Sequence, residues 1–471
     1  MEENKNEQDG LFEDVLPQDT QDVEEQNDES KTSFNEDMPP SKLKRRNVKT
    51  AVLSVAIALI FFVLGGFTVW LTLDKDLLSL MKIKKAIDEH YYQEIDDEQF
   101  YGALISGINN NLLDAYSRYM TADEYSADKS DMAGKRIGIG GVFSTKDSSG
   151  KEQMLVTRVS GNSPAEAAGL LAGDYVTAFG KTETELTESV VFQQFSDFLQ
   201  TCGEGEEFFV RVRRGAEDKM LKMSRQAYVE NYLFYRTSNT AYAFGGQKAS
   251  TLEEKGAPLP FLDEDTAYIR LVQFAGSVSK RFDELMNLFK DQGKKHLILD
   301  LRENGGGYLD IMQHLSQYFC KNSTDKKPLV VVADYGEKQE KFNAVGNKYY
   351  DYFSEDSRIY VIADSGTASA SECLIGCMVD YGVLPFSNIC LVERDGKAKT
   401  YGKGIMQTTF LLGIKGDAIR LTTAEIHWPV SGRSIHGRGV LPEDGAKTVA
   451  ENFHSDLEIA AAWTALTGQN S

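Results

Sequence analysis

The longest apolar run in the chain covers residues 51–73, where 23 consecutive positions carry no ionisable side chain. As an α-helix, this run rises about 34 Å, enough to cross the apolar core of a bilayer. A buried helix of a globular domain would be shorter and amphipathic, and a cleaved signal peptide would have a shorter apolar core before a small-residue cleavage site. The pattern therefore predicts a single uncleaved transmembrane anchor over residues 51–73.

The segments before this run differ sharply in charge. Residues 1–40 carry fourteen acidic side chains and two lysines, a composition that predicts a disordered tail. Five cations follow between residues 42 and 49. Because positive residues stay on the cytoplasmic side, we expect residues 1–50 in the cytoplasm and the chain after the anchor outside the cell membrane.

After the anchor, the hydrophobic pattern changes twice. Residues 74–135 have apolar positions at helical spacing and form a predicted helical segment. Residues 136–226 contain short β-rich runs with glycines, which predicts a small β-rich domain, and residues 227–471 alternate strands with helices. We therefore expect an α+β or α/β multidomain fold. Residues 236–262 are polar and glycine-bearing, and we interpret them as a loop or insertion.

Within the last stretch, the pattern predicts strands followed by helices. The predicted strands are 267–272, 297–301, 329–333 and 358–363, and the predicted helices are 277–291, 308–320 and 369–381. In the β-rich stretch, Ser163 and Pro164 are expected to start a short helix that ends at Gly169.

Composition, charge and residue spacing argue against several classes of function. A net charge of −20 argues against nucleic-acid binding. Five cysteines are too few for a disulfide scaffold and lack zinc-finger spacing, so we expect no metal. Cys373 and Cys377 are interpreted as small buried apolar residues. The glycine-rich run 396–404 has the wrong spacing for a phosphate loop, and we expect no cofactor.

Two expected strand-to-helix corners carry candidate chemistry. Asn304-Gly305-Gly306-Gly307 follows the strand at 297–301, where exposed main-chain N–H groups would suit an oxyanion, although an ordinary turn explains the glycines equally well. Ser369 follows the strand at 358–363 and has capping-box spacing to Glu372, which alone favours a helix cap. The alternative is a nucleophile at a helix N-terminus.

A nucleophilic serine needs a base. The chain has six scattered histidines but neither G-x-S-x-G nor H-E-x-x-H, so histidine is a poor candidate. A lysine kept neutral by burial is the alternative, and Lys403 lies between two glycines before an expected strand at 405–412. Taken alone, a solvated turn lysine is the commoner interpretation.

Taken in order, these motifs resemble the C-terminal processing (tail-specific) peptidase family, whose members are PDZ-containing Ser/Lys serine proteases. The resemblance covers nearly everything after the anchor. It is carried by the PDZ-like stretch and by LDAYSRY at 113–119, DLRENGGG at 300–307, TASASE at 367–372 and TYGKG at 400–404. It implies a membrane-anchored serine endopeptidase that hydrolyses peptide bonds.

The resemblance also implies roles for single residues. Ser369 is the implied nucleophile, Lys403 the general base and Gln407 the residue that orients the lysine. The oxyanion hole would consist of the N–H groups of Gly306 and Ala370. The implied substrate-binding loop, which would capture a free and apolar C-terminus of a protein or peptide, consists of Gly138, Ile139, Gly140 and Gly141.

The chain departs from the family pattern in three places. Gly305 stands where the family usually has proline. Thirty-four positions separate Ser369 from Lys403, more than expected, with the surplus at 383–399. In a regular strand, Lys403 and Gln407 would be about 13 Å apart, so their contact needs a bend, which Gly404 could supply.

Two other functions compete with this interpretation. One is a membrane-anchored PDZ adaptor that binds peptides without cutting them, although Ser369, Lys403 and Gln407 are all present. The other is an α/β-hydrolase, for which the chain lacks a recognisable Ser-His-Asp set. The physiological substrate, a gating partner and assembly into a homo-oligomer stay open.

Overall fold

The computed structural model describes residues 52–65, 74–146, 149–322, 324–413, 416–452 and 455–468. The predicted disordered tail and basic cluster, residues 1–50, lie outside this part, as do Ala51 and residues 66–73 of the predicted anchor. Residues 52–65 are helical, and all their side chains are exposed. No helix in the described ranges is both long and apolar enough to cross a membrane.

The described residues divide into two units, with the boundary between Asp96 and Asp97. In the first, α2 (Lys75–His90) starts after Asp74, whose carboxylate accepts a hydrogen bond of 2.8 Å from the N–H of Asp76. The second unit begins with helices that continue the predicted helical periodicity. These are α3 (Asp97–Gly107), the π-helix η1 (Ile108–Leu112) and α4 (Ala122–Met132), with the short strand β1 (Arg118–Met120) between them.

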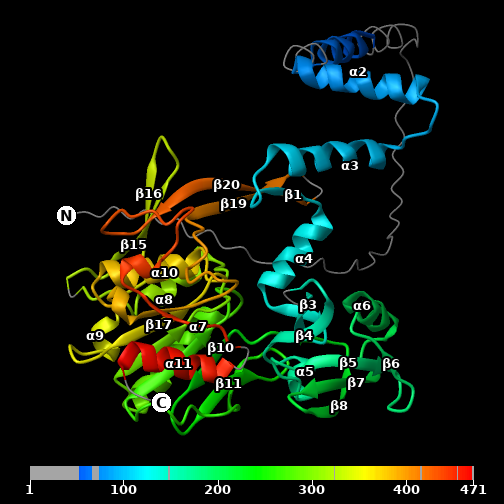
Figure 1. Cartoon of the computed structure of the whole chain (residues 1–471). Helices are drawn as coiled ribbons and strands as arrows, with labels where there is room; N and C mark the ends of the chain where they lie inside the picture. Colours follow the sequence, from blue (N-terminus) through cyan, green and yellow to red (C-terminus); the bar gives the residue numbers. More distant parts are fainter. Residues whose placement is uncertain are drawn as a thin grey trace, which may run out of the picture. The chain divides into compact units, whose positions relative to one another are not determined.

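A β-rich domain follows, as the sequence predicts. Its antiparallel sheet has the order β3-β4-β5-β7-β8, with β6 on β5 (Figure 1). Phe195 of α6 packs at 5.1 Å between ring centroids on Phe179 of β5, so α6 closes the core of this domain. The elements are β2 (Lys135–Gly138), β3 (Gly141–Lys146), β4 (Glu152–Val159), α5 (Pro164–Ala167), β5 (Tyr175–Gly180), β6 (Thr187–Glu188), α6 (Phe192–Thr201), β7 (Glu207–Arg214), β8 (Glu217–Ser224) and β9 (Gln226–Val229).

The short helix predicted at Ser163 is confirmed as α5. The Ser163 hydroxyl accepts a hydrogen bond of 3.2 Å from the N–H of Glu166, and Gly169 beyond the helix has φ +81°. Strands β2 and β9 pair antiparallel, so the chain enters and leaves the β-rich domain at adjacent positions.

The largest sheet has eight strands in the order β12-β11-β10-β13-β14-β17-β18-β21, of which β13 to β21 are parallel. Leu297 and Leu299 of β14 face the helices α7, α8 and α10, whereas Ile298 between them packs with Trp463 of α11. The sheet is therefore covered on both faces, as Figure 1 shows for α11. A buried parallel sheet explains the continuous apolar runs in its strands.

For most helices and strands in this region, the observed first and last residues lie within a few residues of the predicted ones. The elements are β10 (Leu233–Arg236), β11 (Ala241–Gly245), β12 (Thr251–Glu254), β13 (Thr266–Leu271), α7 (Val278–Asp291), β14 (His296–Asp300), α8 (Leu309–Ser316), β15 (Leu329–Asp334), β16 (Gln339–Asn343), α9 (Tyr349–Tyr352), β17 (Ile359–Ala363), α10 (Ala370–Asp380), the 3₁₀ turn η2 (Phe386–Asn388), β18 (Ile389–Val392), β19 (Ile405–Leu412), β20 (Asp417–His427), the 3₁₀ turn η3 (Pro442–Asp444), β21 (Lys447–Val449) and α11 (Ser455–Thr467).

One expectation about insertions is wrong. Residues 236–262 are not a loop, because β11 and β12 form a hairpin that extends the large sheet. Residues 383–399, where the sequence placed the surplus chain beside the lysine, contain β18, a fully buried interior strand. The strands β11, β12 and β18 are short, so their periodicity is weak. Strand β18 also depends on pairing with β17 and β21.

A second sheet connects the first residues of this unit to its last third. Its order is β1-β20-β15-β16, with β19 also pairing with β20. Strand β1 lies antiparallel to β20, with Arg118 opposite Arg420. The segment before the β-rich domain is therefore built into the same structure as the loop that carries Lys403.

Candidate active site

Ser369 lies at the corner between β17 and α10. Its φ and ψ are +56° and −118°, in a region that L-residues other than glycine rarely occupy. Such a conformation costs about 1–3 kcal/mol and persists only where the surroundings enforce it. The side chain is half-buried, and the N-terminus of α10 starts at the next residue, Ala370. A strained serine at a helix N-terminus favours a nucleophile over an ordinary cap.

The glycine corner after β14 packs directly against Ser369. A Cβ added to Gly306, whose φ is +97°, would lie 2.8 Å from the Ser369 Cβ and 2.9 Å from the backbone nitrogen of Ala370. The structure therefore brings together the two residues of the predicted oxyanion hole. The N–H of Gly306 donates to the Asn304 side-chain oxygen at 2.9 Å, so Asn304 engages the hydrogen of this amide.

Asn304 also holds the two corners together. Its main-chain oxygen accepts hydrogen bonds of 2.9 Å from the N–H of Ala368 and from the Ser371 hydroxyl. Its side-chain amide donates to the Leu271 carbonyl at 2.8 Å, and the residue is completely buried. Sequence analysis identified this residue as part of a glycine-rich turn but did not predict that it joins the two corners.

Glu372 joins the serine corner to the lysine loop. Its buried carboxylate accepts a hydrogen bond of 3.1 Å from the N–H of Ser369, which is the backbone contact of the predicted capping box. The same carboxylate accepts from the Thr400 hydroxyl at 2.6 Å and from the N–H groups of Gly402 and Lys403 at 2.8 and 2.9 Å. Burial raises the pKa of Glu372, and these donors oppose the increase.

Lys403 has an unusual environment for a lysine. Its side chain is half-buried, and its ammonium nitrogen lies 4.7 Å from the centroid of the Tyr116 ring. Throughout the described part of the chain, no acceptor lies within hydrogen-bond distance of this nitrogen. Burial lowers the pKa of Lys403, with a further decrease from the positive charge of Arg420 and an opposing effect of Asp114. The amine is thus easier to deprotonate than an exposed lysine.

Gln407 lies on β19, opposite Thr422 of β20, and its amide donates to the Thr422 hydroxyl at 3.4 Å. No hydrogen bond between Gln407 and Lys403 occurs among the described residues. The register of β19 against β20 shifts between Met406, opposite Ala424, and Gln407, opposite Thr422. At Gly404, where the sequence suggested the bend, an added Cβ would lie 2.6 Å from the His436 nitrogen.

The predicted substrate-binding loop, residues 138–141, connects β2 to β3. Gly140 has φ +84°, and a Cβ there would lie 2.3 Å from the Ser163 Cβ. The carbonyls of Ile139 and Gly140 accept hydrogen bonds of 2.8 Å from the N–H groups of Ala165 and Ser160, which fixes the loop. Along the chain, β3 follows this loop. The ring of Phe143 on β3 lies 5.6 Å from the ring of Phe192 on α6.

Sequence analysis missed a buried network of charges beneath the two corners. Arg302 donates to Asp300 at 2.9 Å and pairs with Glu458 of α11. Glu458 also accepts a hydrogen bond of 2.9 Å from Arg394, whose Nε lies 3.1 Å from a carboxylate oxygen of Asp364. Asp300 and Arg302 were visible in the glycine-corner motif, but Glu458 is too far away in the sequence for any motif to connect it.

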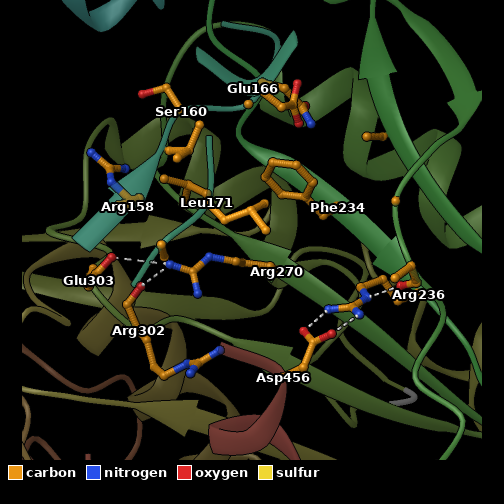
Figure 2. Close-up of a pocket in the computed structure, with 18 of the residues that line it drawn as sticks. Arg158, Ser160, Glu166, Leu171, Phe234, Arg236, Arg270, Arg302, Glu303 and Asp456 are labelled. Atoms are coloured by element: carbon orange, nitrogen blue, oxygen red, sulfur yellow. Dashed lines mark hydrogen bonds and ion pairs between the residues drawn. The ribbon is translucent and has the colours of Figure 1, made fainter. Parts of the chain in front are cut away.

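A cavity of about 600 Å³ lies between the β-rich domain and the large sheet (Figure 2). Arg270 crosses it below Leu171 and Phe234, and contacts Glu303 at 3.4 Å. Arg236 pairs with Asp456 on its other side. None of the predicted site residues lines this cavity, so it is separate from the Ser369 corner. Elsewhere, no cluster of three metal-ligating side chains occurs within the described ranges.

Comparison with known proteins gives a consistent result. The model of peptidase family S41 matches residues 265–444, a range that contains Gly306, Ser369, Lys403 and Gln407. A "Probable CtpA-like serine protease" of Staphylococcus epidermidis is 27% identical over 376 residues, covering 79% of this chain and 66% of the relative. A protein of the same name from Staphylococcus aureus is 26% identical and is covered over 64% of its length.

A solved structure has a similar fold. A "Putative S41 protease" from Bacteroides fragilis superposes with a TM-score of 0.51 over 80% of this chain and 90% of that chain, at 15% sequence identity. At this identity, the likeness concerns the mixed α/β multidomain fold. The chain spans just under two thirds of the length of the first curated relatives it matches.

Proposed function

Because the chain belongs to peptidase family S41, we propose that it is a serine endopeptidase of the C-terminal processing type. In this proposal, Ser369 is the nucleophile and Lys403 the general base. The observation that carries it is the half-buried amine of Lys403, which has a lowered pKa and lies on a loop fastened to the Ser369 turn by Glu372. A neutral amine near a helix-terminal serine is what a Ser-Lys dyad requires.

The chemistry runs in two steps. The Ser369 oxygen bonds to the scissile carbonyl carbon while its proton moves to the Lys403 nitrogen. Lys403 then gives this proton to the leaving amine as the carbon–nitrogen bond breaks, which leaves an acyl-enzyme. A water molecule attacks that ester with Lys403 again as base, and the acid is released as the proton returns to the Ser369 oxygen.

The oxyanion of each tetrahedral intermediate needs hydrogen-bond donors. We assign this role to the N–H groups of Gly306 and Ala370, supported by the contact of Gly306 with both Ser369 and Ala370. In the structure, the Gly306 N–H donates to the Asn304 side-chain oxygen, so this donor must be released from Asn304 or shared with it when the oxyanion forms. Hydrogen-bond donors aimed at the developing charge are usually the largest electrostatic contribution to such reactions.

We propose that Gln407 orients Lys403 indirectly, through other residues. Its amide donates to Thr422, and the N–H of Thr422 donates to the Ser117 hydroxyl at 2.8 Å. Ser117 follows Tyr116, whose ring covers the Lys403 amine. Loss of Gln407 should therefore impair the reaction less than loss of Lys403.

Substrate selection is assigned to residues 138–141 of the β-rich domain, which we propose is PDZ-like. A backbone loop of this kind captures a free carboxylate through its N–H groups, while an apolar pocket accepts the last side chain. Support comes from the fixed loop before β3 and from the aromatic residues of β3 and α6 beside it. The proposed substrates are proteins or peptides with free, apolar C-termini.

A membrane location completes the proposal. The support is the apolar run 51–73, whose described residues 52–65 carry only exposed side chains, together with the cations before it. Uncovered apolar side chains of this kind suit contact with lipid. We propose that the run anchors the protein in the cell membrane, with residues 1–50 cytoplasmic and the peptidase outside.

The decisive experiment is cleavage of an unfolded protein by the full-length protein. Wild-type protein should cleave it, and Ser369→Ala should not. Ser365→Ala is a matched control at the same corner, and it should retain activity. Equal cleavage by Ser369→Ala would refute the assignment of the nucleophile. Binding without cleavage by the wild-type protein would favour the adaptor function instead.

A further inference from the structure

The ring of Tyr116 covers the proposed base. Tyr116 is half-buried, and its ring centroid lies 4.7 Å from the Lys403 nitrogen. Its hydroxyl donates to the hydroxyl of Tyr401 at 3.1 Å, two residues before the lysine. The N–H of Tyr401 donates to the Thr367 carbonyl at 2.9 Å, near the serine. The ring is thus held in place from the lysine loop itself.

The chain segment that carries Tyr116 is also fixed. Asp114 accepts a hydrogen bond of 2.9 Å from the N–H of Tyr116, and the Ser117 hydroxyl accepts one of 2.8 Å from the N–H of Thr422. Strand β1 follows at once and pairs with β20. Asp128 then binds Arg420 of β20 at 2.6 Å. These contacts therefore hold the backbone of Tyr116 in a fixed position.

Resting on the proposed function, we propose that Tyr116 is a positioning residue of the active site, whose ring excludes water from the Lys403 amine and so favours the neutral form of this base. The segment before the β-rich domain then completes the active site, instead of only linking it to the membrane. Tyr116 acts through Lys403 and has no assigned contact with substrate.

Two effects of the ring oppose each other. An aromatic face attracts an ammonium group by about 0.5–2 kcal/mol, which would favour the charged lysine. The ring also displaces water that would otherwise hydrate the ammonium, and burial can lower a lysine pKa by up to about 3–5 units. The Tyr116 hydroxyl donates to Tyr401 and lies at the ring edge, so the amine faces carbon.

Charged groups around the lysine also shift its pKa. Arg420 on β20 lowers the pKa of Lys403, and Asp114 on the Tyr116 segment raises it. Glu372 on α10 binds the main-chain N–H of Lys403. Burial is the largest cause of the lowered pKa, and it outweighs the opposing charge of Asp114. Tyr116 is the aromatic side chain in contact with this amine.

The test measures Lys403 without using peptidase activity. In full-length protein carrying Ser369→Ala, acetylation of lysines by acetic anhydride is followed against pH by peptide mass spectrometry, with exposed Lys397 as an internal reference. The midpoint for Lys403 should lie below that for Lys397. Tyr116→Ala should raise the midpoint, and each unit of increase lowers the neutral fraction at fixed pH about tenfold. Tyr116→Phe, which keeps the ring, should leave it unchanged.

Tyr401→Phe provides a second control, because it removes the hydroxyl pair but not the covering ring. Its Lys403 midpoint should match that of the parent protein. An unchanged midpoint in folded Tyr116→Ala would overturn the proposal, and so would an equal shift in Tyr116→Phe. Because the readout is the midpoint, easier access of the reagent in Tyr116→Ala does not imitate the effect. In the active protein, only Tyr116→Ala should move the rise of kcat/KM to higher pH, which tests the proposed function separately.

Discussion

The carboxylate of Glu372 accepts a hydrogen bond of 2.9 Å from the main-chain N–H of Lys403, 31 residues further along the chain. The same carboxylate binds the N–H of Ser369. One buried side chain therefore fixes the turn of the proposed nucleophile against the loop of the proposed base. The chain between Ser369 and Lys403 contains the helix α10 and the buried strand β18.

Glu372→Gln should reduce activity strongly. All four groups that bind this carboxylate are donors, and the amide would turn an NH₂ group toward some of them. A buried donor left without an acceptor costs about 1–3 kcal/mol. We expect kcat to fall at least tenfold and the urea midpoint to drop. The control is Glu393→Gln, an exposed residue beyond β18, which should change neither. If Glu372→Gln kept the wild-type kcat, the proposal that Glu372 holds the Ser369 turn against the Lys403 loop would be contradicted.

Activity should depend on pH through Lys403. The neutral amine is the active form, so the rate rises as pH increases through the lowered pKa of Lys403 and levels off above it. Lys403→Arg retains a cation that cannot accept a proton and should lose activity by several powers of ten, about 10⁶-fold where nucleophile and base act as a unit. Lys397→Arg, on an exposed turn of the same connection, should remain active. Substantial activity in Lys403→Arg would refute the dyad.

The same shift affects stability. An ordinary lysine has a pKa of about 10.4, so between the lowered folded value and this value the unfolded chain binds more protons than the folded chain. The contribution of Lys403 to the free energy of unfolding should therefore increase with pH in this window. Comparison of Lys403→Met with wild-type protein in urea titrations at several pH values measures it, and an opposite slope would contradict the lowered pKa.

Recognition of a free C-terminus should depend on the loop at 138–141. Gly140→Ala places a Cβ 2.3 Å from the Ser163 Cβ at a φ of +84°, so the loop must distort. Gly138→Ala meets no atom within 4 Å and is a matched control. The measurement is the ratio of cleavage rates for a peptide acid and its C-terminal amide. Wild-type and Gly138→Ala should prefer the acid, and Gly140→Ala should not. A ratio near one in the wild-type protein would remove the assigned role.

The buried charges should contribute to stability. Glu458→Ala leaves Arg302 and Arg394 with one fewer carboxylate partner, and breaking a buried pair costs about 3–5 kcal/mol. Glu451→Ala removes a more exposed partner of Arg394 at 3.5 Å and should cost about 1 kcal/mol or less. Urea unfolding checks both values. Equal effects of the two substitutions would show that burial does not determine the contribution of Glu458.

Topology is tested with a reporter fused after Ser471. Because the cations precede the apolar run, a reporter that is active only outside the cytoplasm should be active in this fusion. A reporter that requires the cytoplasm should be inactive there. The reverse result would contradict the orientation of the proposed anchor, without affecting the assignment of Ser369 or Lys403.

The sequence by itself determined the local elements and the chemistry at their ends. The strand-helix alternation around Ser369 agrees with β17 and α10 to within one residue at each end, because apolar periodicity and a capping glutamate act over a few neighbouring positions. The glycine corner at Gly306 was likewise visible, since its conformation requires residues without a Cβ. The hairpin strands β11 and β12 were missed because four or five residues carry little periodicity, and β18 because its partners β17 and β21 lie far away in the sequence.

Only the tertiary structure decided how these parts meet. No spacing rule connects Tyr116 to Lys403, or Glu458 to Arg302, because these contacts exist only after β1 pairs with β20 and α11 packs on the large sheet. Burial of Lys403 and the fastening by Glu372 likewise arise from that packing. A pKa depends on the water and charges around a group, and folding, not local sequence, brings those surroundings together.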